Sequence, residues 1–344
     1  MIKSSVMLTP VAPMGHLVEL ARLAEELGYS RIWVPDEGLA SRDVFVVMAA
    51  MAAATDTIQI GTGIVNPYSR HPALTTSAVA SIDELSGGRA FLGYGAGGSL
   101  TLGPLGIERP RPLVHVREAI ELSRRLFAGE PVDMDGETVS LQQARVGFAR
   151  ADTEIWFAGR GPRMLRQAGG LVDGVLLEFL HKPTLGDYVA VVNEGAERTG
   201  NTPTLCYATM VITNPARLEE VRPHMTYRLV DSPPKVKELL GITEADTAAI
   251  AKAMHNGLEA AAELIPDEWV DPFVISGTVD ACAAELSGLM SAHGFSEFML
   301  VVTDMDGAAT LMTEVAEVVA ATVLRPTTDS TQQETGTDDE PRTF

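Results

Sequence analysis

The chain has 344 residues, of which 46% are hydrophobic and 21% charged, a composition able to bury a large core. Its formal net charge of −20 argues against nucleic acid and anionic membranes as main partners, because both require a cationic surface. The 2 cysteines are too few for a disulfide framework or a structural zinc site. No basic leader and no apolar run of about 18 residues is apparent, so we expect a cytoplasmic protein.

Apolar runs and helical spacings alternate along the chain. The expected strands cover residues 4–8, 31–35, 57–63, 89–94, 154–158, 172–179, 204–212 and 298–303. The expected helices cover 13–27, 43–54, 72–85, 112–127, a stretch from 163, then 188–198, 279–293 and 308–324. Short connections between these elements indicate parallel strands with crossover helices. A barrel of about 250 residues and a doubly wound open sheet both fit this alternation.

Three stretches depart from the alternation. Residues 129–147 are less regular, and we expect a surface excursion there. Residues 214–273 are largely helical, which predicts an insertion before the last βα unit. From residue 326 the chain is rich in Thr, Gln, Asp and Glu, so 326–344 is expected to be a disordered acidic tail. The remaining residues, 1–325, are expected to form a single domain.

The most informative stretch is 61–107, which reads as strand, turn, helix, strand and glycine-rich loop. It contains the runs Asn66-Pro67-Tyr68, Arg70-His71-Pro72-Ala73, Ile82-Asp83-Glu84-Leu85-Ser86, Gly88-Arg89-Ala90 and Leu105-Gly106-Ile107. In these runs the chain resembles the bacterial-luciferase-like flavin and deazaflavin oxidoreductases. Within them it is most similar to methylenetetrahydromethanopterin reductases, which use coenzyme F420. The resemblance implies a luciferase-like (β/α)8 TIM barrel.

The turn after the third expected strand contains Gly63, Ile64 and Asn66. From the residues alone, Gly63 is an ordinary strand-end glycine. The resemblance implies a non-prolyl cis peptide between Gly63 and Ile64, behind the cofactor ring. It also implies that Asn66 lies near that ring.

The fourth expected strand leads into a second glycine cluster, which includes Gly95, Gly97 and Gly98. Its amides can approach a ligand closely, and a flexible connection is the alternative. Because the GxGxxG spacing is lacking, a dinucleotide fingerprint is not expected. The resemblance implies that this loop contacts the cofactor.

A third turn, Gly159-Arg160-Gly161-Pro162, joins a strand to a helix. Free amides at a helix start suit a phosphate, although Pro162 is also common at any first helical position. The resemblance implies that Gly159, Arg160, Gly161 and Pro162 hold the phosphate of the cofactor tail. Glu178, at the end of the sixth expected strand, is also expected to contact the cofactor.

Asp36 and Glu37 follow the second expected strand. Hydride transfer requires a neighbouring group to handle a proton, and the resemblance places this pair close to the reactive face. We predict Glu37 and Asp36 as catalytic residues, with Asp36 also contacting the cofactor. A buried glutamate with a raised pKa suits an acid at neutral pH. The alternative is an acidic pair at a helix entry or in an ion pair.

The chain departs from the reductases at two positions. They usually have a glutamate near the end of the first strand, where this chain has Met7, and an acidic residue near Gly98. The first departure predicts a more apolar pocket, with Met14 and Tyr68, suited to another substrate than methylenetetrahydromethanopterin. Core packing is the alternative role for the methionines.

The sequence therefore predicts hydride transfer between coenzyme F420 and a small organic substrate. An FMN-dependent monooxygenase of the same fold and a non-catalytic cofactor-binding barrel remain alternatives. No HExxH-type spacing is present, so no metal site is expected. The resemblance implies a homodimer, and the helical insertion is expected to close over the substrate.

Overall fold

A computed structural model describes residues 2–214 and 217–323 of the chain. Within them, eight parallel strands close a barrel in the order β1-β12-β9-β8-β7-β4-β3-β2. In chain order these are β1 (Lys3–Leu8), β2 (Arg31–Val34), β3 (Gln59–Thr62), β4 (Ala90–Tyr94), β7 (Ile155–Ala158), β8 (Gly174–Glu178), β9 (Thr204–Thr209) and β12 (Glu297–Val302). The alternation therefore belongs to a closed barrel and not to an open sheet. The expected strand 204–212 is split into β9 and the short β10 (Val211–Ile212).

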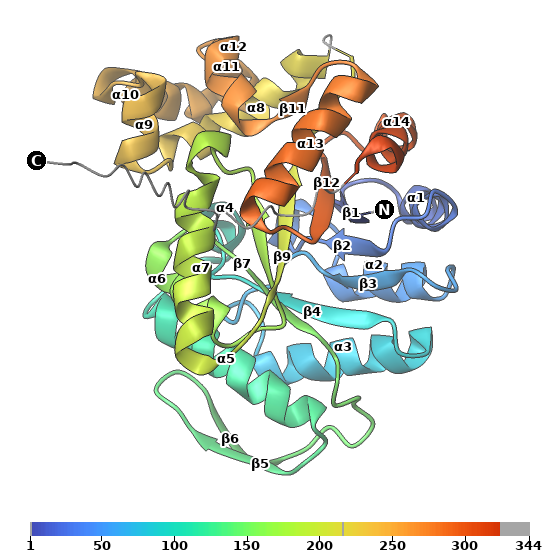
Figure 1. Cartoon of the computed structure of the whole chain (residues 1–344). Coiled ribbons are helices and arrows are strands. Elements are labelled where there is room, and N and C mark those ends of the chain that lie inside the picture. Colours follow the sequence, from blue (N-terminus) through green and yellow to red (C-terminus); the bar gives the residue numbers. More distant parts are fainter. Residues whose placement is uncertain (1, 215–216, 324–344) are drawn as a thin grey trace, which may run out of the picture.

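Helices surround the barrel in an outer ring (Figure 1). They are α1 (Met14–Glu26), α2 (Val44–Ala52), α3 (Pro72–Ser86), α5 (Pro112–Phe127), α6 (Pro162–Gly169), α7 (Leu185–Thr199), α13 (Val279–His293) and α14 (Ala308–Ala321). Their starts follow local sequence signals. Asp43 caps α2, since its Oδ1 accepts hydrogen bonds from the amides of Phe45 and Val46. No described helix is long and apolar enough to cross a membrane.

Large side chains fill the inside of the barrel. The Trp33 ring lies edge-to-face against Phe91 and Trp156, with ring centroids 4.6 and 5.1 Å apart. These rings belong to an interior cluster that includes Ala208, Met299 and Val301 of the barrel strands. The cluster continues beyond the barrel through Phe179, Met210, Val221, Met225, Leu229 and Ile250. The barrel is therefore a packed core with no open channel, as in other barrels of eight strands.

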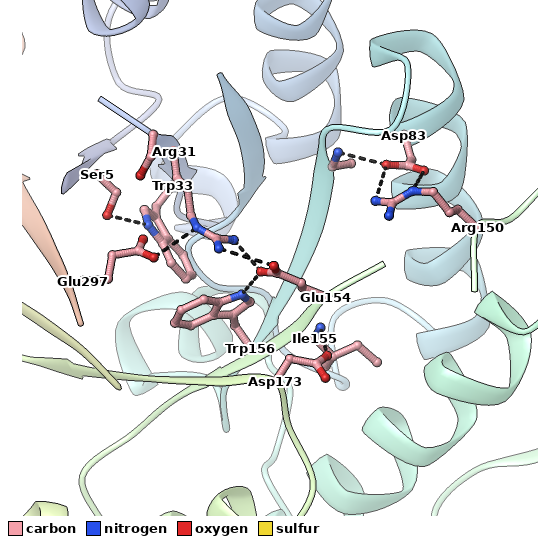
Figure 2. Close-up of polar contacts among 12 residues, drawn as sticks. Ser5, Arg31, Trp33, Asp83, Arg150, Glu154, Ile155, Trp156, Asp173 and Glu297 are labelled. Atoms are coloured by element: carbon pink, nitrogen blue, oxygen red, sulfur yellow. Dashed lines mark hydrogen bonds and ion pairs between the residues drawn. The ribbon is translucent and has the colours of Figure 1, made fainter. Parts of the chain in front are cut away.

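The interior cluster is closed at one end by a polar network (Figure 2). Arg31, at the start of β2, pairs through Nη1 with Glu154 Oε2 at 2.5 Å and through Nε with Glu297 Oε2 at 3.2 Å. The two indoles join the network, because Trp156 Nε1 donates to Glu154 and Trp33 Nε1 donates to Ser5 Oγ. The ion pairs lie at the amino ends of strands, because Arg31 begins β2, Glu297 begins β12 and Glu154 precedes β7. This is the face of a barrel that contributes to stability.

The prediction of irregular structure over residues 129–147 is wrong. The chain forms an antiparallel hairpin of β5 (Val132–Asp135) and β6 (Ser140–Ala144). The Glu118 carboxylate in α5 fixes the turn by accepting hydrogen bonds from the amides of Glu137, Thr138 and Val139. A long-range anchor of this kind has no signature in the hairpin's own sequence.

Helices also fill the stretch between β9 and α13. They are α8 (Leu218–Val230), α9 (Pro234–Leu240), α10 (Glu244–Ala253), α11 (Leu258–Ala262) and α12 (Asp267–Val270), and we call residues 218–273 the helical segment. It is flanked by β10 and β11 (Ile275–Ser276), which pair in parallel. Figure 1 shows the helical segment and the β5–β6 hairpin at opposite ends of the molecule. The tail expected over 326–344 lies outside the described residues.

Candidate active site

The carboxyl ends of the parallel strands form one face of the barrel, which we call the mouth. Asp36, Ile64, Gly95, Gly159 and Glu178 follow or end five of these strands. In barrels of this type the loops at this face carry the active site. The topology therefore brings the sequence-predicted residues to one face, although they are far apart along the chain.

The turn after β3 has the predicted geometry, because the peptide bond between Gly63 and Ile64 is cis. A Cβ atom at Gly63 would lie 2.6 Å from Trp33 Cβ, and one at Gly95 would lie 1.9 Å from Ile64 Cδ1. Gly63 therefore has no room for a side chain, whereas a side chain at Gly95 would displace the end of Ile64. Ile64 is half-buried and packs on the interior cluster, as does the half-buried Met7 at the end of β1. An apolar surface results at the centre of the mouth.

Asn66 and Gly97 lie in contact beside this surface. Gly97 has a φ of +75°, and a Cβ there would lie 3.1 Å from Asn66 Cβ. The Asn66 Oδ1 accepts hydrogen bonds from the amides of Tyr68 and Ser69, each at 2.9 Å. The Asn66 oxygen therefore shapes the turn, and the residue is buried there. Gly98 is exposed and a Cβ there would meet nothing closer than 4.0 Å.

The two acidic candidates lie between the β3 turn and the helical segment. The Asp36 amide donates to the Ile64 carbonyl at 3.3 Å, and Asp36 Oδ1 accepts from the Gly38 amide at 3.1 Å. Desolvation by the surrounding protein raises the pKa of Asp36. Desolvation, followed by the charges of Glu178 and Asp36, likewise raises the pKa of Glu37, whose side chain stays open to solvent. Such groups can hold and release protons nearer neutral pH than ordinary carboxylates.

The third predicted turn opens α6. Gly161 is the N-cap residue, Pro162 is the first helical residue, and no described side chain caps this end. Its free amides and the helix dipole suit an anion. Arg160 is half-buried beside it. Gly159 is crowded, because a Cβ there would lie 2.7 Å from the Phe157 ring.

Glu178 has a partner that sequence reasoning missed. Arg228, from α8, places Nη2 3.0 Å from Glu178 Oε1, while its Cζ lies 4.0 Å from the centroid of the Phe179 ring. Arg228 is only 7% exposed. Nothing in the local sequence distinguishes it from Arg222, the other arginine of the helical segment. It becomes recognisable only once the fold places α8 over the end of β8.

A comparison with known protein families matches residues 1–297 to the luciferase-like monooxygenases. The chain belongs to this family. The 5,10-methylenetetrahydromethanopterin reductase of Methanolobus tindarius is 34% identical over 289 residues, which is 82% of this chain and 88% of that protein. The corresponding enzyme of Archaeoglobus fulgidus is 33% identical over 307 residues, 85% of this chain and 91% of that protein.

Among solved structures, the coenzyme F420 dependent tetrahydromethanopterin reductase from Methanopyrus kandleri has the same luciferase-like fold. It has a TM-score of 0.83 at 24% identity, covering 93% of this chain and 99% of that chain. The resemblance and the barrel predicted from the sequence are therefore confirmed.

His71 caps α3, since its Nδ1 accepts a hydrogen bond from the Ala73 amide at 3.2 Å. Within residues 2–214 and 217–323, no group of three or more His, Cys, Asp or Glu side chains is arranged to hold a metal ion.

Proposed function

We propose that this protein is a coenzyme F420-dependent oxidoreductase that transfers a hydride between the deazaflavin and a small organic substrate. The observation that carries the proposal is the apolar surface at the mouth, formed by the Gly63–Ile64 turn. It coincides with the family membership and with the likeness to a coenzyme F420 dependent structure. When bound, the deazaflavin supplies the hydride chemistry, and the protein supplies orientation and electrostatics.

The residues present fit such a cofactor. Gly63 and Gly95 let the backbone pack directly against Trp33 and Ile64, which fixes Ile64 at the mouth, where a flat ring would lie beside it. Gly97, Gly98 and Asn66 would border that ring. At the other side of the mouth, Gly161 and the start of α6 would hold a phosphate of the tail.

Glu37 would hold or move the proton that accompanies the hydride. Its raised pKa and its place beside Asp36 suit a general acid or base. Asp36 would orient the loop, because its carboxylate and amide are both hydrogen-bonded locally. Glu178 would act from a distance, through its charge on Glu37, because Arg228 already holds its carboxylate.

Two titrations of the purified protein test the cofactor, one with coenzyme F420 and one with FMN, both followed by tryptophan fluorescence. Trp33 and Trp156 lie beneath the mouth in the interior cluster, so binding there should quench their emission. Saturable binding of the deazaflavin alone is expected. Saturable binding of FMN alone would overturn the proposal in favour of an oxygen-dependent monooxygenase with a partner reductase. Binding of neither would favour a non-catalytic barrel.

The substrate is expected to differ from methylenetetrahydromethanopterin. The half-buried Met7 occupies the end of β1 where the resembling reductases usually have a carboxylate. An assay with reduced F420 and methylenetetrahydromethanopterin should therefore give little turnover in this protein. Introducing the missing acid with Met7→Glu should raise turnover, and no rise would show that Met7 does not set this preference.

We also propose a cytoplasmic homodimer. Both cysteines are free and buried, which suits a reducing compartment. Val46 on α2 and Leu74 on α3 are each 59% exposed, and large apolar side chains on neighbouring helices suit a subunit interface. Sedimentation of the wild type and of a Val46→Glu, Leu74→Glu double variant would separate dimer from monomer.

A further inference from the structure

Two segments beside the mouth reverse the charge of the chain, which has 46 Asp and Glu residues against 26 Lys and Arg. Residues 109–117 lead into α5 and form its first turns, and residues 155–172 contain β7 and α6. Neither segment contains an acidic residue. Their arginines are Arg109, Arg111, Arg117, Arg160, Arg163 and Arg166. Positive charge is therefore concentrated in these two segments of an acidic protein.

The two segments lie next to each other, because α5 and α6 are neighbours in the outer ring (Figure 1). Gln167 Nε2 in α6 donates to the Leu113 carbonyl in the first turn of α5 at 3.0 Å. Arg163 stands four residues before Gln167, so it lies on the same face of α6 and one turn nearer the mouth. Arg163 is therefore placed beside the residues that precede Leu113, among them Arg109 and Arg111.

The chain that leads into α5 is fixed against the mouth. Arg109 Nη1 donates to the Gly97 carbonyl, and Tyr68 Oη donates to the Pro110 carbonyl at 2.8 Å. The Tyr68 ring also lies edge-on to the His115 ring, with centroids 4.4 Å apart. The Arg109 guanidinium is thus held beside the glycine loop, so it loses little freedom when it binds an anion.

Two of the arginines have charge that the protein does not use. Arg111, Arg117 and Arg166 each pair with a glutamate. Arg109 and Arg163 are exposed, and neither has an ion-pair partner among the described residues. A cation whose charge no carboxylate neutralises attracts anions to its part of the surface.

The starts of the two helices add to this positive potential. Gly161 is the N-cap residue of α6 and Arg111 that of α5, and neither side chain caps its helix. The amides and dipoles of both helix starts therefore act on the same surface. The exposed Glu108 offsets one charge at the edge of this surface. We call Arg109 and Arg163, with the starts of α5 and α6, the arginine strip.

We propose that the arginine strip binds the oligoglutamate tail of coenzyme F420, with Arg109 and Arg163 as its cationic contacts. The inference rests on the proposed function, and it extends the cofactor site from the α6 turn, where the phosphate would lie, to the start of α5. Beyond its phosphate, coenzyme F420 continues into a lactyl group and a chain of glutamates, which carries several carboxylates. Guanidiniums match carboxylates in geometry and charge, and separated guanidiniums suit a flexible polyanion.

Two forms of coenzyme F420 test the proposal by equilibrium binding to the full-length protein, followed by tryptophan fluorescence at low ionic strength. One form carries a long glutamate tail, and the other keeps the phosphate and the lactyl group but has no glutamate. Because exposed charge contacts each contribute roughly a factor of two to five, the long-tailed form should bind about five- to twentyfold more tightly. This difference should fade in about 0.5 M salt, which screens exposed charges.

Variants at the strip separate the tail from the rest of the cofactor. An Arg109→Gln, Arg163→Gln double variant should lose the difference and bind the form without glutamates like the wild type. Arg163→Gln alone, which leaves the contact of Arg109 with Gly97 intact, should lose part of it. An Arg125→Gln, Arg145→Gln double variant is the matched control, because it removes two exposed arginines beside the β5–β6 hairpin that each donate to a backbone carbonyl. The control should keep the full difference.

The proposal is overturned if the two forms bind the wild type equally, if the double variant at the strip keeps the difference, or if the hairpin control loses as much. Failure of both forms to bind would overturn the proposed function instead. A free oligo-γ-glutamate peptide would then decide the fate of the strip. Binding that depends on Arg109 and Arg163 would retain it as a polyanion site, and absence of such binding would overturn it as well.

Discussion

The two ends of the barrel differ in how far their charged residues are paired. At the amino ends of the strands, Arg31 is held by both Glu154 and Glu297, and an indole N–H donates to Glu154, although burial raises the pKa of Glu297 and leaves its Oε1 without a partner among the described residues (Figure 2). At the mouth, Glu37 has a raised pKa and Arg228 keeps an unpaired N–H.

This difference separates residues that stabilise the fold from residues that could take part in the reaction. Although burial opposes it, the hydrogen bonds and charge of Arg31 lower the pKa of Glu154, so the ionised form is the stable one. At the mouth, desolvation and like charges disfavour the ionised form of Glu37 instead. Where such groups gather at the mouth of a barrel, they indicate a site at which a ligand or a proton binds.

The largest expected effect is on activity at the mouth. Glu37→Gln should lower kcat by about 10²- to 10⁴-fold if Glu37 transfers the proton, while F420 affinity stays within a factor of two or so. Because the fold raises the pKa of Glu37, its ionised form adds no stability, and the free energy of unfolding at pH 7 should change by no more than about 0.5 kcal/mol. Glu84→Gln, an exposed carboxylate on α3, is the control. Unchanged kcat in Glu37→Gln would assign the proton to another group.

The next largest effect is expected on stability, at the amino ends of the strands. Arg31→Met leaves two carboxylates without their cation, and removal of one partner from a buried ionic group costs about 3–5 kcal/mol. Denaturant unfolding should record that loss, while F420 affinity of the folded fraction stays unchanged. Lys235→Met, which breaks an exposed pair with Asp187, should cost no more than about 1 kcal/mol. A loss in Arg31→Met as small as in this control would remove the distinction between the two ends.

A smaller effect is expected at the hairpin. Although burial opposes it, hydrogen bonds from Thr138, Glu137 and Val139 lower the pKa of Glu118 to about 2 from the usual 4.5. The folded pKa lies below the unfolded one, so the stabilisation is complete above pH 4.5 and is lost as pH falls towards 2. Glu118→Gln should therefore cost about 1–3 kcal/mol at pH 7 and little at pH 2 to 3. Unfolding measured at both pH values checks this, and an equal cost at both would contradict it.

The smallest expected effect tests the geometry of the mouth. Gly95→Ala forces the Ile64 side chain to move, because the new Cβ would lie 1.9 Å from its Cδ1. Displacement of Ile64 would disturb the surface on which the ring is expected to lie, and a loss of about 1 kcal/mol of binding free energy would weaken F420 binding roughly fivefold. Gly98→Ala, with open space around it, should bind F420 like the wild type. Equal affinities in the two variants would place the ring elsewhere.

The sequence predicted the barrel well because its signals are local. The ranges of α5 and α13 match the expected 112–127 and 279–293, and the Asp43 cap is present. The Gly63–Ile64 turn was predicted only through a family resemblance. The β5–β6 hairpin was missed because Glu118, which fixes its turn, lies in a helix outside the hairpin. Arg228 was missed for a similar reason, since its partner Glu178 is fifty residues earlier in the chain.

The interior cluster has a consequence for how the molecule can be altered. Trp33 and Phe91 in the barrel share this cluster with Val221, Met225 and Leu229 of α8. We therefore propose that residues 1–325 unfold as one unit, so hydrogen exchange in α8 should be as slow as in the strands. An engineer who replaces the helical segment with that of a relative would have to exchange the matching barrel residues as well. A change of substrate preference through the helical segment would then also require a change in the core on which that segment packs.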